Sequence, residues 1–159
     1  MKGVLRLFSK ILVPLDGSEH SLKALEEAVQ IAKKFSGKIT LIHVYSVQPI
    51  MMPEPSTMGS LSIPIITGAE VSMMIEATKK LGNKILDDGE QSVKTSGIRI
   101  EKILVEGHAV EEIVKVANQG NFDLIVIGAR GVSHMREMLL GSVTDGVIHH
   151  ARCPVLVMK

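Results

Sequence analysis

Short runs of hydrophobic residues alternate along the chain with longer segments in which hydrophobic residues recur every three or four positions. The short runs are rich in β-branched residues and predict five strands, at Ile11–Leu15, Lys38–Tyr45, Ile98–Val105, Asp123–Ile127 and Pro154–Met158. Three of these runs are almost continuously apolar, which is typical of parallel strands that are covered on both faces. The pattern therefore predicts a buried parallel sheet.

The segments between the strands have the periodicity of amphipathic helices. The first begins after Ser18 and closes at Gly37, and the others begin near Ala69, His108 and Ser142. Alternation of strands and helices requires right-handed crossovers and places helices on both faces of a mostly parallel sheet. We predict a single α/β domain over residues 1–159, an open sandwich of five parallel strands.

One segment, residues 46–68, breaks the alternation. It contains four of the chain's six prolines, so it fits neither a regular helix nor a central strand. A loop longer than about 15 residues inside a compact domain is usually either functional or disordered. Two interpretations stay open: a mobile surface excursion, or a methionine-rich flap that covers a site or binds a partner.

Composition narrows the class of protein. The 159 residues are 45% hydrophobic and carry a formal net charge of +1, as in one ordinary globular domain. Near-neutral charge and only 3% aromatic residues argue against nucleic acid as a partner. No apolar run approaches the roughly 18 residues that span a membrane, no signal peptide is recognisable, and Cys153 has no second cysteine to pair with. We therefore expect a cytoplasmic protein without a membrane partner.

The candidate site lies where the fourth strand ends. In an open parallel sheet, ligands bind outside the carboxyl ends of the strands, and Gly128 and Gly131 follow the fourth strand directly. Gly141 and Ser142 stand at the start of the last helix, where free N–H groups and the helix dipole attract anions. Ser142 and Thr144 would add hydroxyl donors, so a phosphate site is indicated. The alternative is structural: the glycines shape turns and Ser142 is an N-cap, worth about 1 kcal/mol.

Other phosphate-binding motifs are absent from the sequence. No G-x-x-x-x-G-K-[ST] motif occurs, and no G-x-G-x-x-G follows the first strand. A phosphate site in this chain would thus belong to neither the P-loop class nor the dinucleotide-binding class.

The glycine spacing resembles a known family signature. Gly128-x-x-Gly131, nine residues and then Gly141-Ser142 is similar to the pattern of the ATP-binding branch of the universal stress protein family. The resemblance extends over nearly the whole chain, through residues 11–18, 41–44, 106–108 and 153–157. It implies a five-stranded parallel sheet in the order 3-2-1-4-5, an ATP site across the first and fourth strands, and a homodimer formed through the last strand, Pro154–Met158.

The resemblance also implies roles for individual residues. Pro14 and Val44 would flank the adenine, and Asp16 would accept hydrogen bonds from the ribose or help to hold Mg²⁺ or Mn²⁺. The phosphates would be wrapped, mainly through backbone N–H groups, by Gly128, Gly131, Gly141, Ser142 and Val143, and Ile127 and Arg130 would lie at the edge. The implied site also includes Leu15 and Thr144. An alternative role for Asp16 is the N-cap of the first helix, with Glu19 as its capping-box partner.

Several other residues have plain structural explanations. We expect His43 to be a hydrogen-bonded core histidine, the adjacent His149 and His150 to lie at a solvated helix end, and Cys153 to be inert. His108 begins a helix and could reach the site, and Arg136 either meets phosphate or lies on the surface.

The sequence offers no convincing catalytic base beside the glycine turns, although phosphoanhydride hydrolysis requires one. We therefore predict a nucleotide-dependent stress-response or signalling module with little or no hydrolysis, acting on a regulatory protein partner of unknown identity. Two alternatives stay open: a slow ATPase or nucleotidyl-transfer enzyme, and a dimeric regulatory module that binds no ligand.

Overall fold

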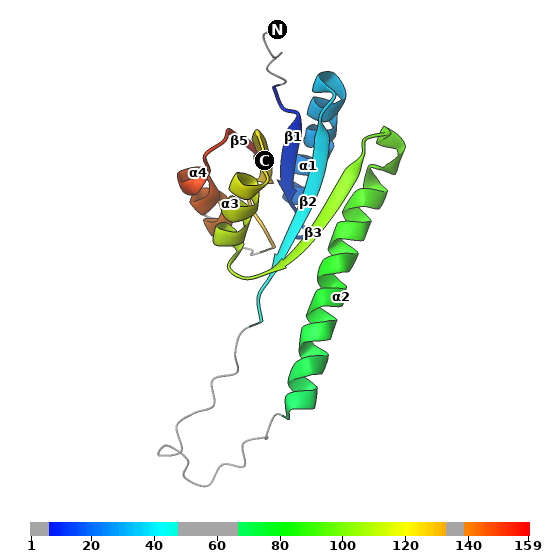
Figure 1. Cartoon of the computed structure of the whole chain (residues 1–159), viewed down its shortest axis with the longest axis vertical. Coiled ribbons are helices and arrows are strands. Elements are labelled where there is room, and N and C mark those ends of the chain that lie inside the picture. The colour runs from blue at the N-terminus through cyan, green and yellow to red at the C-terminus, as the bar shows by residue number, and fades with distance from the viewer. Residues whose placement is uncertain (1–6, 48–66, 133–138) are drawn as a thin grey trace.

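The computed structural model describes residues 7–47, 67–132 and 139–159. It contains a five-stranded sheet in the order β3-β2-β1-β4-β5, in which every neighbouring pair is parallel (Figure 1). The strands are β1 (Lys10–Pro14), β2 (Lys38–Tyr45), β3 (Ile100–Glu106), β4 (Leu124–Gly128) and β5 (Val155–Met158). The predicted fold class and strand order are confirmed.

Helices cover both faces of the sheet. They are α1 (Glu19–Phe35), α2 (Gly68–Ser92), α3 (Ala109–Gln119) and α4 (Ser142–His150), with a short 3-10 turn at Lys94–Ser96. Helices α1 and α2 pack on one face, and α3 and α4 pack on the other. Among the described residues, no helix combines the length and the apolar character needed to cross a membrane.

The core consists of two layers that share the central strands. Ile11 and Val13 point toward α1 and α2, whereas Leu12 between them points toward α3 and α4. All three are fully buried. Because side chains alternate across a strand, a sheet covered on both faces requires apolar residues at consecutive positions. Each such side chain contributes about 1.5–3 kcal/mol through burial.

The end of α1 differs slightly from the sequence expectation. Ser36, not Gly37, adopts the left-handed conformation, with φ of 54°. Gly37 follows with its N–H donating to the Ala32 carbonyl oxygen at 2.9 Å. A Cβ on Gly37 would collide with the carbonyl oxygen of Phe8. The glycine is therefore required by close packing of the N-terminal segment.

Helix α2 is long and only partly supported. Thr67 caps it through a capping box with Glu70, whose carboxylate accepts the Thr67 N–H at 2.7 Å. Its buried residues are Gly82, Leu86 and Gly89, all in the C-terminal half, and the N-terminal half projects beyond the sheet (Figure 1). The predicted loop thus ends at Thr67. Its residues 48–66 lie outside the described residues, so both interpretations of the loop stay open.

Candidate functional site

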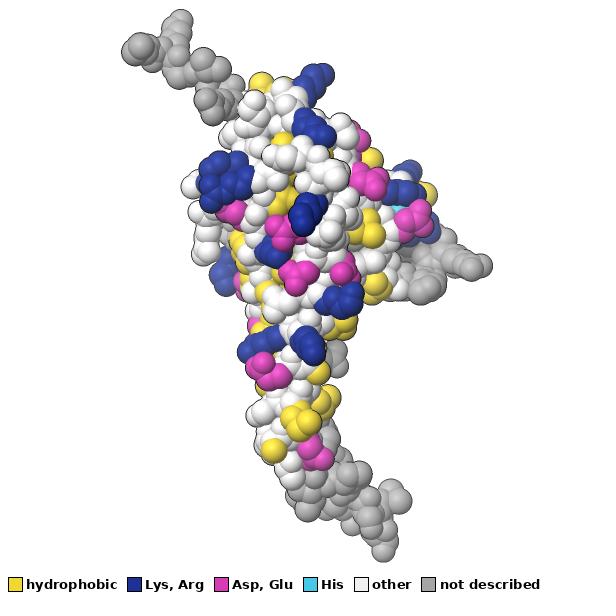
Figure 2. Space-filling view, turned by 90° about the vertical axis from the view of Figure 1, so that its right-hand side faces the viewer, with side chains coloured by type: hydrophobic (Ala, Val, Ile, Leu, Met, Phe, Trp, Pro, Cys, Tyr) yellow, Lys and Arg dark blue, Asp and Glu magenta, His cyan; other side chains and the backbone are white. Residues whose placement is uncertain are grey.

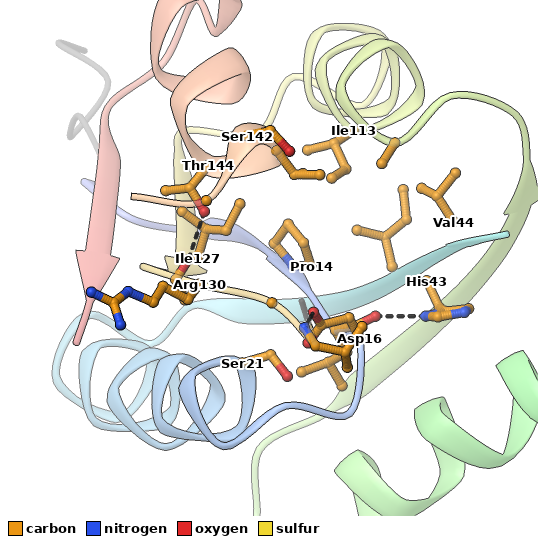
Figure 3. Close-up of a pocket in the computed structure, with 18 residues that line it drawn as sticks. Pro14, Asp16, Ser21, His43, Val44, Ile113, Ile127, Arg130, Ser142 and Thr144 are labelled. Atoms are coloured by element: carbon orange, nitrogen blue, oxygen red, sulfur yellow. Dashed lines mark hydrogen bonds between the residues drawn. The ribbon is translucent and has the colours of Figure 1, made fainter. Parts of the chain in front are cut away.

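A pocket of about 200 Å³ lies at the carboxyl ends of β1, β2 and β4 (Figure 3). The strand order reverses direction between β1 and β4, which is where open α/β sheets bind ligands. The pocket is lined by every residue predicted for the nucleotide site: Pro14, Leu15, Asp16, Val44, Ile127, Gly128, Arg130, Gly131, Gly141, Ser142, Val143 and Thr144. The structure therefore brings together residues that are up to 130 positions apart in the sequence.

One end of the pocket is apolar. Pro14 from β1 and Val44 from β2 face Ile113 of α3, with Ile127 beside them (Figure 3). Ile42 of β2 also lines the pocket. Apolar walls with a few polar groups at one end are typical of sites for small organic ligands. The chemistry of this end suits a weakly polar group.

Six lining residues were not predicted: Ser21, Ile42, His43, Ala109, Ile113 and Val132. Ala109 and Ile113 are four residues apart on α3, so they share one face of that helix. The periodicity of the sequence marked Ile113 as a core position, but it did not show that α3 closes one side of the pocket.

Asp16 connects two loops at the mouth of the pocket. The turn after it uses Gly17 in a left-handed conformation, with φ of 82°. One carboxylate oxygen of Asp16 accepts the Ser18 N–H at 3.0 Å, and the other accepts the Val132 N–H at 3.1 Å. A carboxylate has about four acceptor positions, so Asp16 can still accept a hydrogen bond from a ligand hydroxyl.

The alternative role of Asp16 as the N-cap of α1 is wrong. Ser18 is the N-cap, and its hydroxyl oxygen accepts the Ser21 N–H at 3.2 Å. Glu19 pairs with Lys23 at 2.8 Å instead of closing a capping box on Asp16. Asp16 lies two positions before the N-cap residue Ser18, which is too far from the first helical turn for capping.

Metal binding at Asp16 would involve few protein ligands. In residues 7–47, 67–132 and 139–159, no group of three His, Cys, Asp or Glu side chains could hold an ion. A single carboxylate is nevertheless compatible with Mg²⁺ that is held mainly by substrate phosphates and water. Asp16 is suited to that limited role, in which the ion would neutralise phosphate charge.

The start of α4 presents a row of backbone donors. Gly141 is the N-cap, and its carbonyl oxygen accepts the first helical hydrogen bond, from the Asp145 N–H at 2.9 Å. The N–H groups of Ser142, Val143 and Thr144 precede that bond and have no partner inside the helix. Together with the helix dipole they form an anion-binding end. The alternative of Ser142 as the N-cap is wrong, because Ser142 is already the first helical residue.

Thr144 uses its hydroxyl for the fold. The side chain is 3% exposed, and its Oγ1 donates to the carbonyl oxygen of Gly128 at 2.7 Å. This bond fixes the start of α4 against the end of β4. The hydroxyl proton of Thr144 is thus already engaged, whereas the Ser142 side chain is exposed.

The three signature glycines differ in what a side chain would meet. A Cβ on Gly128 would lie 2.7 Å from the His20 carbonyl carbon in α1, and a Cβ on Gly131 would collide with the Asp16 carboxylate. A Cβ on Gly141 would meet its described neighbours only at ordinary contact distances of 3.5–3.7 Å. Packing of α1 against the end of β4 therefore requires Gly128, and the position of the Asp16 side chain favours Gly131, whereas these contacts leave room for a side chain at Gly141.

The remaining histidines have structural surroundings. His43 is hydrogen-bonded as predicted, with Nδ1 2.7 Å from the Leu15 carbonyl oxygen, but it is partly exposed and lines the pocket instead of lying in the core. The rings of His149 and His150 are exposed and bond to carbonyl oxygens of the preceding helical turn. His108 is the N-cap residue of α3 and is not among the residues that line the pocket.

The remaining predicted residues are Arg130, Cys153 and Arg136. The guanidinium of Arg130 points away from Pro14 and Val44 (Figure 3). Burial raises the pKa of the Cys153 thiol, which agrees with the expectation that this cysteine is unreactive. Arg136 lies outside the described residues.

Comparison with known proteins assigns the family. The sequence profile of the universal stress protein family matches residues 7–159, so this chain belongs to the universal stress protein family. The chain is 34% identical to universal stress protein YxiE of Bacillus subtilis over 96% of this chain and 100% of that protein.

Solved structures show the same fold. Universal stress protein UspA from Lactobacillus plantarum superposes with a TM-score of 0.79 at 26% identity, over 96% of this chain and 99% of that one. A universal stress protein solved in complex with cAMP gives a TM-score of 0.65 at 26% identity, over 96% of this chain and 98% of that one.

Proposed function

We propose that this chain binds an adenine nucleotide, with ATP as the expected ligand, and acts as a nucleotide-dependent stress-response or signalling module with little or no hydrolysis. The observation that carries the proposal is the start of α4. Three backbone N–H groups, at Ser142, Val143 and Thr144, directly follow Gly141. A side chain at Gly141 would make only ordinary contacts with its described neighbours, so packing does not explain why this residue is a glycine. The complex of a similar protein with cAMP supports an adenine nucleotide as the ligand class.

Each part of the pocket would hold one part of the nucleotide. The adenine would lie in the apolar end between Pro14 and Val44, and the ribose would lie near Asp16. The phosphates would lie against the start of α4, where the open position at Gly141 allows the backbone to approach closely. Mg²⁺ bound with the nucleotide would offset phosphate charge beside Asp16.

The test is equilibrium binding of ATP by calorimetry, with and without Mg²⁺. We expect micromolar affinity, which corresponds to about 8 kcal/mol, and at least a tenfold loss in Gly141→Val. Gly68→Val is the matched control, because a Cβ there has nothing within 4 Å among the described residues and the position lies at the start of α2, away from the pocket. Circular dichroism checks that both variants remain folded. Wild-type affinity in Gly141→Val would show that the start of α4 does not bind phosphate.

Hydrolysis is tested in the same samples. Among the described residues, the pocket is lined by one carboxylate, Asp16, whose two oxygens each accept a backbone N–H, and by one histidine, His43, whose Nδ1 bonds to the Leu15 carbonyl oxygen. Asp145 in the first turn of α4 is exposed and does not line the pocket. We therefore expect no phosphate release above the background rate. Turnover that disappears in Asp16→Ala would favour a slow ATPase, and absence of nucleotide binding would favour the ligand-free regulatory module.

We further propose a homodimer formed through β5, in the cytoplasm, with an unidentified regulatory protein as the downstream partner. Strand β5 lies at one end of the sheet order and consists of four partly buried apolar residues. An apolar edge strand of this kind readily pairs with a second copy. A reducing compartment suits a chain whose single cysteine is free.

A further inference from the structure

Helix α2 exposes large apolar side chains in its projecting half and at the residue next to it, Leu81. Met73 is 72% exposed, Met74 is 56% exposed and Leu81 is 60% exposed. Figure 2 shows hydrophobic side chains on this projecting arm, interspersed with charged ones. Exposed apolar residues that cluster on one element mark a contact surface more often than isolated ones do.

These residues lie on one face of the helix. Glu70, Met74, Ala77, Leu81 and Lys84 follow one another at steps of four, three, four and three, the spacing of a helix-pairing seam. Met73 lies beside this seam, one helical turn before Ala77. We call this set the α2 seam. It lies on a different side of the helix from Gly82, Leu86 and Gly89, which pack on the body of the protein.

Most of the α2 seam is complementary to itself in the antiparallel direction, and Met74 lies opposite Lys80, whose hydrocarbon stem can pack against it. If two copies cross at Ala77, Met73 of each copy faces Leu81 of the other, because each lies four residues from the centre. Glu70 then faces Lys84, because each lies seven residues from the centre. The small side chain of Ala77 at the crossing allows the two helices to approach closely.

Charge supports this direction over the parallel one. In a parallel pair, Glu70 would face Glu70 and Lys84 would face Lys84, whereas the antiparallel pair places opposite charges together. One oxygen of the Glu70 carboxylate caps Thr67 within the same chain, which holds the side chain at the start of the helix. Lys84 bonds to Asp88 on the exposed surface.

We propose that a second copy of this chain pairs with the α2 seam, in an antiparallel crossing of two α2 helices centred on Ala77. The contact is isologous, because the same residues are contributed by both copies. Helix α2 packs on β2 and β3, and β5 lies at the opposite end of the strand order. The pairing is therefore separate from the β5 edge and from the nucleotide pocket, and the two kinds of contact can coexist in one assembly.

Disulfide trapping tests the crossing point. In a Cys153→Ser background, Ala77→Cys places identical thiols on both sides of the symmetry axis, within reach of a disulfide. Ser72→Cys is the matched control: Ser72 is also exposed on the projecting half but points about 140° away from Ala77 around the helix. We expect mild oxidation to give covalent dimer at least tenfold faster from Ala77→Cys. Equal rates in the two variants would overturn the proposal.

Sedimentation provides a second test that leaves the buried half of α2 intact. Met73→Glu puts a negative charge opposite Leu81 of the second copy without disturbing the core, because Met73 is 72% exposed. We expect the sedimenting mass to fall to half of the wild-type value, and Met73→Leu to retain the wild-type mass. An unchanged mass in Met73→Glu contradicts the pairing. ATP binding should be the same in both variants, so failure of this proposal is distinguishable from failure of the nucleotide site.

Discussion

Replacing Thr144 with valine should destabilise the protein, although the two side chains have nearly the same shape. Thr144 is 3% exposed and donates to the Gly128 carbonyl oxygen at 2.7 Å. Valine fills the space but leaves this buried acceptor without its donor. A hydrogen bond contributes about 1 kcal/mol net, and a buried group left unsatisfied costs about 1–3 kcal/mol. We expect the free energy of unfolding to fall by about 1–3 kcal/mol.

Urea denaturation followed by circular dichroism measures this change. Thr144→Ser keeps the hydroxyl and removes one methyl group, so it should lose only about 0.8 kcal/mol. Ser142→Ala removes an exposed hydroxyl two residues earlier and should stay within about 0.5 kcal/mol of wild type. The order of stability is thus Ser142→Ala, then Thr144→Ser, then Thr144→Val.

A wild-type urea midpoint for Thr144→Val would refute this reasoning. It would mean that the hydroxyl does not hold α4 against β4, and direct donation from Thr144 to a phosphate would again be the better explanation of its place in the pocket. Measuring the ATP affinity of Thr144→Val separates the two roles further, because only the phosphate-donor role predicts that this variant loses affinity without losing stability. Thr144→Ser is the control, since both roles predict that it binds ATP.

Two further predictions concern packing and assembly. Gly82→Val should lower the free energy of unfolding, measured by urea denaturation, by about 1–3 kcal/mol. The reason is that a Cβ at this position would lie 2.6 Å from Leu104 Cδ1 and 2.8 Å from His43 Cδ2. A stability equal to that of Gly68→Val would contradict this packing. In a Met73→Glu background, which removes the proposed α2 pairing, deletion of residues 153–159 should abolish the β5 dimer in sedimentation. A soluble dimer that persists in this double variant would show that β5 is not the interface.

The strands could be predicted because a strand that is buried on both faces has apolar residues at consecutive positions. Strand β2 has the predicted bounds, and β1, β4 and β5 differ by one residue at one or both ends. Strand β3 begins two residues later than predicted, at Ile100. The reason is local: Gly97 has φ of 72°, and the Ile98 N–H donates to the Ser96 side chain instead of entering the sheet.

Helix caps were harder to predict than strands. Asp16 and Ser142 both have side chains that favour N-cap positions, yet the caps are Ser18 and Gly141. Capping depends on which residue has extended φ and ψ directly before the first helical turn. The turn at Gly17 and the hydrogen bond from the Gly141 N–H to the Ala129 carbonyl oxygen set that residue, and both depend on tertiary structure.

The glycine signature shows why spacing alone cannot assign a function to each of its members. In the sequence Gly128, Gly131 and Gly141 are equivalent marks of a phosphate-binding turn. In the structure the first is required because α1 passes close to the end of β4, and the second because the Asp16 carboxylate bridges to the neighbouring loop. At Gly141, φ is −74° and a side chain would have ordinary contacts with its described neighbours, so its packing and backbone conformation do not account for the glycine. A substitution at Gly128 disturbs the packing of α1, and one at Gly131 displaces the Asp16 carboxylate in the pocket. Gly141 is therefore the position at which phosphate binding can be tested separately from packing.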